Sequence, residues 1–360
     1  MGTLFSPLAL RRLELANRIV ISPMCQYSAR EGCATAWHHA HLGSLALSGA
    51  GLLCLEATAV VPEGRISPQD LGLWNDQTEE ALGRVVEMIR AVSPIKLALQ
   101  LGHAGRKASM PAPWVGGPAV PAAAGGWLPV APSALAYSDS YRQPRALEPT
   151  EIEAVIEAFA DSARRAARIG FDAVEVHAAH GYLLHQFLSP LSNRREDEFG
   201  GCLANRMRLP LAVFDAVRAS FPSDRPVGVR VSATDWVESQ ASWQLDDTIA
   251  FAQALKPLGC DWIDVSSGGL SPAQKITPAP GYQLPLAQAV RAASGLTTMA
   301  VGLITEPQQA EAVLASGQAD LVALGRRFLF DPHWAWRAAR ELGIDIPVPP
   351  QYQRALPAAA

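Results

Sequence analysis

Cysteine is scarce in this sequence, and its placement excludes several kinds of site. The chain has five cysteines among 360 residues, an odd number, scattered without a Cys-x-x-Cys pair. Such a pattern does not build a disulfide framework, and it argues against a structural zinc site or an iron–sulfur cluster. It is typical of a protein from a reducing compartment, so we expect a cytoplasmic location.

An excess of positive charge and long apolar runs are also missing. The formal charge is -4 at pH 7, so there is no basic field to attract nucleic acid. No apolar run approaches the length that crosses a membrane, and the N-terminus lacks the hydrophobic region of a signal peptide. No Gly-x-Gly-x-x-Gly motif follows a predicted strand, so a Rossmann-type dinucleotide site is not supported. We therefore expect neither a nucleic-acid partner nor a membrane partner.

Apolar residues, by contrast, are abundant and form a long series of buried strands. They make up 49% of the chain, and charged residues only 18%, which is enough for a large core. Near-continuous apolar runs are typical of parallel strands buried on both faces, and helical segments intervene between these runs. Eight such strands predict an α/β fold, a single (β/α)8 TIM barrel spanning residues 1–360. The predicted strands begin at Arg18, Leu52, Ile95, Ala173, Val227, Trp262, Thr297 and Leu321.

Residues 108–149 interrupt this alternation after the third strand. The segment is rich in proline and glycine and has no helical or strand periodicity. A structureless loop of this length inside a compact domain is uncommon and usually functional. We interpret it as a capping insertion over the barrel mouth, with a short hairpin. The next helix is predicted over Thr150–Ile169, with Thr150 as N-cap and Glu153 completing a capping box.

One stretch places proton-exchanging side chains at the end of a strand. Ala173–Val176 is a predicted buried strand, and His177, His180 and Tyr182 follow it. Chemistry in parallel α/β proteins is located at the carboxyl ends of strands, so these side chains can converge if the chain breaks at Gly181. A neutral imidazole can donate to a carbonyl oxygen, and a phenol can give a proton. Two structural histidines that cap a helix are the alternative. A metal site is less favoured, because the spacing is not His-Glu-x-x-His and no third ligand is evident.

Two runs of the sequence resemble a known enzyme family. The run from His177 to Asn193 resembles the signature of the Old Yellow Enzyme family, which are flavin-dependent ene-reductases. The run Ser-Pro-Met-Cys-Gln-Tyr over residues 22–27 resembles the bacterial thermophilic-like subgroup and is similar to xenobiotic reductases. The resemblance extends from Arg18 to Arg354.

The resemblance implies a function and its cofactors. FMN would bind non-covalently over the barrel mouth, and NAD(P)H would bind transiently in the open pocket, reduce FMN and leave. The substrates would be α,β-unsaturated carbonyl compounds, including enones and imides, or nitro compounds. His177 and His180 would hold the activating oxygen of the substrate. Hydride would pass from flavin N5 to the β-carbon, and Tyr182 would protonate the α-carbon.

The resemblance also implies which residues hold FMN. Cys25 would replace a threonine beside the flavin C4=O and tune the flavin potential, and Tyr27 would line the substrate pocket. After the last two strands, Gly302 and Gly325 allow backbone N–H groups to approach a phosphate closely, and Arg326 supplies positive charge. The residues expected around the flavin ring are Pro23, Met24, Cys25, Ala57, Gln100 and Arg230.

Several of these residues also have a simpler explanation. Cys25 can be a buried inert cysteine, because free cysteine is often buried. Gln100 lies inside an apolar strand and needs hydrogen-bond partners, which a flavin edge or the backbone can supply. The buried guanidinium of Arg230 must be paired, either by the negative edge of a reduced flavin or by an acidic core residue such as Glu175. The family usually has alanine where Gly102 stands, which leaves extra room.

The C-terminal tail, residues 345–360, is rich in proline and carries an arginine. Composition alone favours a solvated chain end. However, the run Gln-Tyr-Gln-Arg over residues 351–354 resembles the end of the thermophilic-like subgroup, where an arginine reaches into the neighbouring subunit's active site. The resemblance thus implies that Arg354 binds substrate in a neighbouring subunit and that the protein is a homodimer or homotetramer. The subgroup's aromatic residue after this arginine is absent, so Leu356 would provide the packing.

Two other functions remain open from the sequence. A barrel aldolase or isomerase could use Lys107 as a Schiff base, but Lys107 follows its strand and is not expected inside an apolar site. A flavin- or phosphate-binding sensor would keep the phosphate loops, but it has no use for the His-His-Tyr triplet. We therefore expect an NAD(P)H-dependent flavin oxidoreductase of the NADPH dehydrogenase or ene-reductase type.

Overall fold

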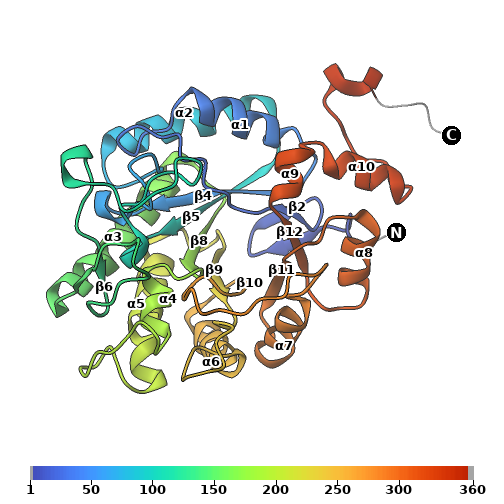
Figure 1. Cartoon of the computed structure of the whole chain (residues 1–360). Helices are drawn as coiled ribbons and strands as arrows, with labels where there is room; N and C mark the ends of the chain where they lie inside the picture. The colour runs from blue at the N-terminus through green and yellow to red at the C-terminus, as the bar shows by residue number, and fades with distance from the viewer. Residues whose placement is uncertain (1–2, 356–360) are drawn as a thin grey trace.

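The computed structural model describes residues 3–355 and contains a closed barrel of eight parallel strands. Figure 1 shows these strands at the centre of the molecule, and their order around the barrel follows the sequence. The predicted (β/α)8 barrel is confirmed, with each strand start within one residue of its predicted position. The barrel strands are β3 (Ile19–Ile21), β4 (Leu52–Ala59), β5 (Lys96–Gly102), β8 (Ala173–Ala178), β9 (Val227–Ser232), β10 (Trp262–Ser266), β11 (Thr297–Val301) and β12 (Leu321–Leu324).

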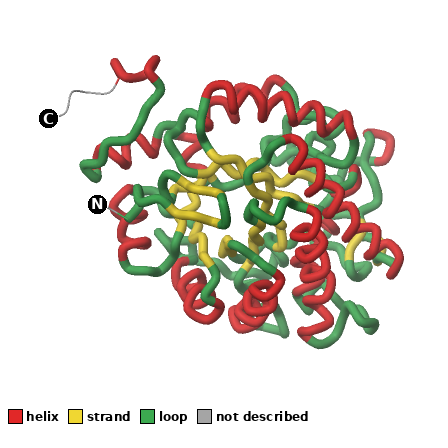
Figure 2. The backbone as a smooth tube through the Cα atoms, turned by 180° about the vertical axis from the view of Figure 1, so that it is seen from behind, coloured by secondary structure: helices red, strands yellow, loops and turns green. Residues whose placement is uncertain are grey.

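Helices surround the barrel on all sides, as Figures 1 and 2 show. Among residues 3–355, no helix has the length and apolar content needed to span a membrane. The main helices are α1 (Ala36–Ala46), α2 (Asp76–Val92), α3 (Pro149–Ile169), α5 (Leu203–Ser220), α6 (Leu245–Leu255), α7 (Leu284–Ser294), α8 (Pro307–Ala315) and α10 (Trp334–Glu341). Two short helices, α4 (Leu183–Leu188) and α9 (Arg326–Phe330), follow β8 and β12 directly.

Alternation along the strands separates an apolar outer core from a polar interior. On β8, Val174 and Val176 belong to the core between the barrel and the helices. The intervening residues Glu175 and His177 point to the other face, because successive side chains of a strand alternate. Strand register places Arg230 of β9 beside His177, so polar inward residues of neighbouring strands lie together.

The amino-terminal end of the barrel is closed by apolar side chains. The leucines of the hairpin β1 (Leu8–Leu10) and β2 (Leu13–Leu15) form one core cluster with the inward apolar residues of the strands. Trp262 fills this interior so closely that a Cβ atom at Gly228 would overlap its indole ring. The polar side chains therefore face the carboxyl-terminal end, where barrel active sites lie.

The start of α3 differs from its prediction. The helix begins at Pro149 with Glu148 as N-cap, and the backbone N–H of Glu148 donates to Glu151 Oε2 at 2.8 Å. The predicted capping box of Thr150 and Glu153 is therefore wrong by two residues. Proline is favoured at the first helical position, where its missing N–H costs no helical hydrogen bond.

The segment 108–149 contains no short hairpin, so that prediction is also wrong. Its two strands, β6 (Val130–Ala131) and β7 (Arg145–Ala146), pair in parallel. A parallel pair needs a crossover connection, whereas a hairpin joins antiparallel strands. The residues between β6 and β7 provide this connection, and β7 leads into α3.

Candidate active site

The two histidines and the tyrosine predicted as a catalytic group come together at the end of β8. His177 lies inside the strand, which extends past its predicted end, and Tyr182 is the N-cap of α4. The chain turns between them through His180 (φ 57°) and Gly181 (φ 74°) in the left-handed region. The ring centroid of His177 lies 5.2 Å from that of His180 and 5.0 Å from that of Tyr182. The rings of His180 and Tyr182 therefore both lie next to the imidazole of His177.

Hydrogen bonds fix the orientation of the two imidazoles. The backbone N–H of Ala179 donates to His177 Nδ1 at 3.3 Å, so the ring proton of neutral His177 is on Nε2. The backbone N–H of His180 donates to Ser232 Oγ at 2.9 Å, and His180 Nε2 lies 2.8 Å from Ser266 Oγ. The sequence interpretation missed both serines. Their positions could have indicated them. Each serine lies two residues after an inward-facing polar residue of its strand and therefore faces the same side.

Burial keeps these three groups uncharged at neutral pH. Loss of solvation lowers the pKa of His177 and of His180 well below the usual range, and the positive charge of Arg230 adds to the effect. Burial also raises the pKa of Tyr182 well above its usual value, with nearby Cys25 as the second cause. The site therefore presents two neutral imidazoles and a neutral phenol, which can donate hydrogen bonds or a proton.

A different histidine has the structural role. His185 of α4 accepts a hydrogen bond from the backbone N–H of Gly181 at Nδ1 (2.9 Å), and its Nε2 lies 3.0 Å from Asp235. The N-terminus of α4 receives no side-chain cap from His177 or His180. Within the described ranges, no cluster of three or more His, Cys, Asp or Glu side chains could hold a metal ion.

Gln100 and Arg230 have carboxylate neighbours beneath the histidines. The amide of Gln100 donates to Glu175 Oε1 at 2.8 Å, and the indole N–H of Trp262 donates to Glu175 Oε2 at 3.1 Å. The guanidinium Nε of Arg230 lies 3.1 Å from Asp264 Oδ2. The sequence alternative for Gln100 was a backbone partner, and its partner is a side chain instead. The alternative for Arg230 was an acidic core residue such as Glu175, and its partner is an acidic core residue, Asp264. Asp264 could have been found as a buried acid inside an apolar strand.

The other residues predicted beside the flavin ring lie on the strands and loops next to this cluster. Pro23, Met24 and Cys25 follow β3, and Ala57 is near the end of β4; all four are half-buried. Burial raises the pKa of the Cys25 thiol well above its usual value, so the thiol is protonated. A Cβ atom at Gly325 would lie 3.4 Å from the sulfur of Met24, so the ends of β3 and β12 are neighbours.

Gly302 and Arg326 follow β11 and β12. Gly302 has φ 119°, and a side chain there would meet the amide of Gln283, which donates to Val301 O at 2.8 Å. The positive φ and this contact together favour glycine here, independently of any phosphate. Arg326 is exposed and begins α9.

Gly102 leaves room for one methyl group. A Cβ atom there would lie 3.6 Å from His177 Cβ and 3.9 Å from Ala57 Cβ, which are ordinary contact distances. The space belongs to a cavity of about 10 Å³ that is also bordered by Tyr182. A volume of this order is about that of one water-sized probe.

Lys107 lies inside the site, contrary to the sequence expectation. Its Nζ donates to His180 O at 2.8 Å and to Gly269 O at 3.0 Å. The same nitrogen lies 5.1 Å from the ring centroid of Tyr182 and 4.8 Å from that of Tyr137. The expectation that Lys107 is outside an apolar site is therefore wrong, because the loop after β10 and the segment 108–149 close around it.

The segment 108–149 contacts several site residues. The ring of Tyr27 packs edge-to-face against Trp114, with centroids 5.6 Å apart. The indole N–H of Trp127 donates to Glu63 O at 2.8 Å, and the guanidinium of Arg106 donates to Leu135 O at 3.3 Å. These contacts place the segment beside Tyr27 and next to the loop after β5.

Arg354 does not join the site of its own chain. Residues 344–352 line a groove of about 1040 Å³ together with residues that precede β3, β4 and β5, at the amino-terminal end of the barrel. The ring of Tyr352 packs on Trp336 and His333, with centroids 5.5 Å from each. Arg354 itself is exposed, and Figure 1 shows this end of the chain projecting away from the barrel. Leu356 lies outside the described residues.

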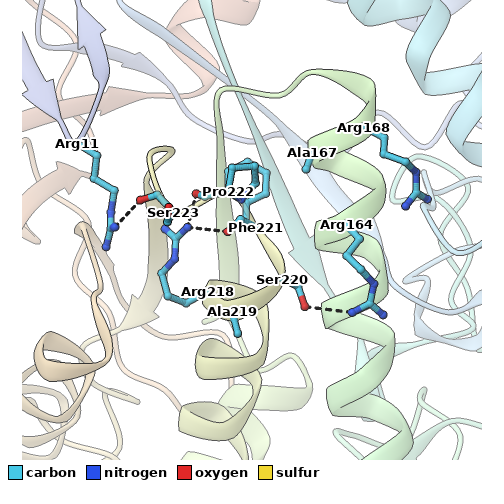
Figure 3. A pocket seen from close by; sticks show the side chains of 10 residues that line it. All are labelled: Arg11, Arg164, Ala167, Arg168, Arg218, Ala219, Ser220, Phe221, Pro222 and Ser223. Carbon is cyan, nitrogen blue, oxygen red and sulfur yellow. Dashed lines mark hydrogen bonds between the residues drawn. The ribbon is translucent and has the colours of Figure 1, made fainter.

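A second cavity, about 750 Å³, lies at the amino-terminal end of the barrel, between the hairpin turn and the ends of α3 and α5. Figure 3 shows four arginines among its lining residues. Each guanidinium has a protein partner. The pairs are Arg11 with Asp261, Arg218 with Pro222 O, Arg164 with Ser220 and Arg168 with Glu79.

Comparisons with known proteins identify the family of the chain. A family model described as NADH:flavin oxidoreductase / NADH oxidase matches residues 3–344. The NADPH dehydrogenase of Geobacillus thermodenitrificans is 44% identical over 353 residues, covering 98% of both chains. That of Listeria innocua is 45% identical over 359 residues, covering 99% of both. The solved structure of morphinone reductase in complex with tetrahydroNAD is 30% identical with a TM-score of 0.78, covering 98% of this chain and 94% of that one.

Proposed function

Because the chain belongs to the NADH:flavin oxidoreductase / NADH oxidase family, we propose that it reduces the activated C=C bond of α,β-unsaturated carbonyl or nitro compounds. The resemblance to the Old Yellow Enzyme family is confirmed by these relatives and by the likeness to morphinone reductase. The protein is an NAD(P)H-dependent flavin oxidoreductase with FMN as cofactor. Its substrate class and the roles of its residues form the proposal.

The convergence of three uncharged rings is the observation that supports the proposal most. When bound, FMN would supply the hydride that reaches the β-carbon of the substrate. His177 donates its Nε2–H to the carbonyl or nitro oxygen, and its Nδ1 accepts from Ala179. In the tautomer whose Nε2 accepts from Ser266, His180 donates from Nδ1 to the same oxygen. These donors stabilise the negative charge that develops on the oxygen.

Tyr182 completes the reaction by protonating the α-carbon. Its ring borders the same space as His177, and its raised pKa keeps the proton on the phenol until the substrate needs it. The reaction then requires one proton from Tyr182, which solvent later restores. Tyr27, beside Trp114, lines the other side of the substrate space.

Arg230 supports the fit of FMN to this site. In the described part of the chain, its terminal guanidinium nitrogens donate to no protein acceptor, while Nε faces Asp264. Free guanidinium donors suit the anionic edge of a reduced flavin. Pro23, Met24, Cys25 and Ala57 would border the ring and Gln100 would lie beneath it. Gly302, Gly325 and Arg326 would bind the phosphate, so that FMN is held without a covalent bond.

Two further parts of the chain belong to this proposal. The segment 108–149 acts as a cap over the mouth, because it contacts Tyr27 and the Lys107 region. Arg354, which is exposed and remote from its own chain's site, reaches the substrate space of a neighbouring subunit in a homodimer or homotetramer.

Replacing Tyr182 by phenylalanine tests the proposal. With FMN bound, NADPH should reduce the flavin at the wild-type rate, because that step needs no proton from Tyr182. Re-oxidation by 2-cyclohexenone should slow by roughly 10²–10⁴-fold. Both rates are measured by stopped-flow absorbance. Wild-type re-oxidation in Tyr182→Phe would show that another group, or water, is the proton donor.

A further inference from the structure

Lys107 is a half-buried cation without a carboxylate partner. It follows β5 at the end of a 3-10 turn (Gly105–Lys107), and its Nζ donates to the carbonyl oxygens of His180 and Gly269. Among the described residues, no Asp or Glu forms an ion pair with it. Burying a charge in this way is costly unless another interaction compensates for it.

The compensating contacts are two tyrosine rings. The ammonium lies 4.8 Å from the ring centroid of Tyr137, and 5.1 Å from that of Tyr182. A cation at this distance is attracted to the electron-rich face of an aromatic ring. The attraction becomes much stronger when the ring carries a full negative charge, because the screening inside a protein is weaker than in water.

The proposed reaction creates such a charge on Tyr182. When the O–H bond of Tyr182 breaks and its proton forms the new C–H bond at the substrate α-carbon, the bonding electrons remain on the phenol oxygen. The product of this step is a half-buried phenolate, whose charge is disfavoured by loss of solvation, as the raised pKa of Tyr182 indicates. Lys107 is the lysine beside this ring, and it is already held in place by two carbonyl groups.

We propose that Lys107 is a positioning residue that supplies the counter-charge for the phenolate formed at Tyr182. The proposal rests on the proton-donor role of Tyr182 given above. The bonds to His180 and Gly269 hold the ammonium beside the ring of Tyr182, and the ammonium charge assists proton transfer.

The charged and titratable groups around Lys107 come from three elements. Arg106 precedes it, and Tyr137 lies on the segment 108–149. His177 lies near the end of β8, and His180 and Tyr182 follow that strand. Burial, and then the like charge of Arg106, lower the pKa of Lys107 to about 8. The ammonium is therefore present at neutral pH and is lost as the pH rises above about 8, so its assistance to proton transfer should be lost in the same range.

The test compares the two half-reactions of the FMN-loaded enzyme. Lys107→Met keeps the length of the side chain and removes the charge, whereas Lys107→Arg keeps the charge. We expect Lys107→Met to slow re-oxidation by 2-cyclohexenone by roughly 10–10²-fold, with reduction by NADPH and thermal unfolding close to wild type. Lys107→Arg should retain more of the re-oxidation rate.

Two additional measurements separate a counter-charge from a merely structural contact. In the Tyr182→Phe background, Lys107→Met should have no further effect on re-oxidation, because there is no phenolate left to stabilise. The wild-type re-oxidation rate should fall above about pH 8, whereas the rate of Lys107→Met should be slow and independent of pH between 7 and 9.

The outcomes distinguish this inference from the proposed function. Equal slowing of both half-reactions by Lys107→Met, or a full additional loss in the Tyr182→Phe background, would show that Lys107 only holds the loop. If the re-oxidation rates of wild type and Lys107→Met depend on pH in the same way, the counter-charge role of Lys107 is also overturned. Unchanged re-oxidation in Tyr182→Phe alone would instead overturn the proton-donor role on which the inference rests.

Discussion

Replacing Glu175 by glutamine should change how the stability of the protein depends on pH. Glu175 is almost fully buried and accepts hydrogen bonds from Gln100 and Trp262. Two buried carboxyl groups, Glu175 and Asp264, share this interior with the single guanidinium of Arg230. Burial, followed by the negative charge of Asp264, raises the pKa of Glu175 from 4.5 to about 7.

The sign and size of the effect follow from this shift. Because the pKa of Glu175 is higher in the folded state, the folded chain holds a proton that the unfolded chain has released between pH 4.5 and 7. The contribution of this proton to the free energy of unfolding is therefore complete below pH 4.5, and it is lost as the pH rises to about 7. A shift of this size corresponds to about 3 kcal/mol of unfolding free energy, at about 1.4 kcal/mol per pKa unit. Glutamine does not titrate, so the variant should not show this loss.

The assay is urea-induced unfolding of wild type and Glu175→Gln at pH 5 and pH 8, each with saturating FMN. The difference in unfolding free energy between variant and wild type should move in favour of the variant by about 2.5 kcal/mol between the two pH values, because part of the loss has already occurred at pH 5. Glu153→Gln on the exposed face of α3 is the control and should show no such movement. If the difference in unfolding free energy between Glu175→Gln and wild type is the same at pH 5 and pH 8, Glu175 is not protonated at the centre of the barrel.

The remaining predictions concern Cys25 and the C-terminal tail. Because a thiol donates only weakly, Cys25→Ser should shift the flavin reduction potential in a dye-equilibration titration while FMN stays bound; an unchanged potential would remove Cys25 from the flavin contacts. Arg354→Ala and a deletion of residues 350–360 should both raise the KM for 2-cyclohexenone. The deletion should also weaken subunit association in sedimentation experiments. If both variants show wild-type kinetics and wild-type association, the tail is only a solvated chain end.

The barrel itself could be predicted from the sequence because it depends on local patterns. The apolar runs that begin at Leu52, Ala173 and Trp262 are strands in the structure, starting at those residues. Parallel strands buried on both faces produce this pattern without help from distant residues. The convergence of His177, His180 and Tyr182 also follows from a local feature, the left-handed turn at the end of β8.

The partners of the buried polar residues could not be predicted in the same way. Strand order and register decide that Arg230 faces Asp264 and that Gln100 faces Glu175. Residue spacing along one strand contains no information about the register of its neighbour. The sequence showed that these polar side chains need partners, but not which acid each would find.

Lys107 illustrates the limit of local reasoning most clearly. Its position just after β5 suggested that it lies outside an apolar site. The carbonyl group of Gly269, 162 residues further along the chain, and the ring of Tyr137 close around the ammonium. Burial of this kind depends on the packing of distant loops at the barrel mouth, which hydrophobic periodicity does not encode.

The central claim is tested most directly by the absorbance of the purified protein under anaerobic conditions. The account predicts a yellow protein whose FMN absorbance is bleached by NADPH and restored by 2-cyclohexenone, with cyclohexanone as a control that restores nothing. A colourless protein that takes up no FMN would contradict the assignment of the cofactor. If NADPH bleaches the flavin but neither 2-cyclohexenone nor other activated alkenes re-oxidise it, the proposed ene-reductase activity is contradicted.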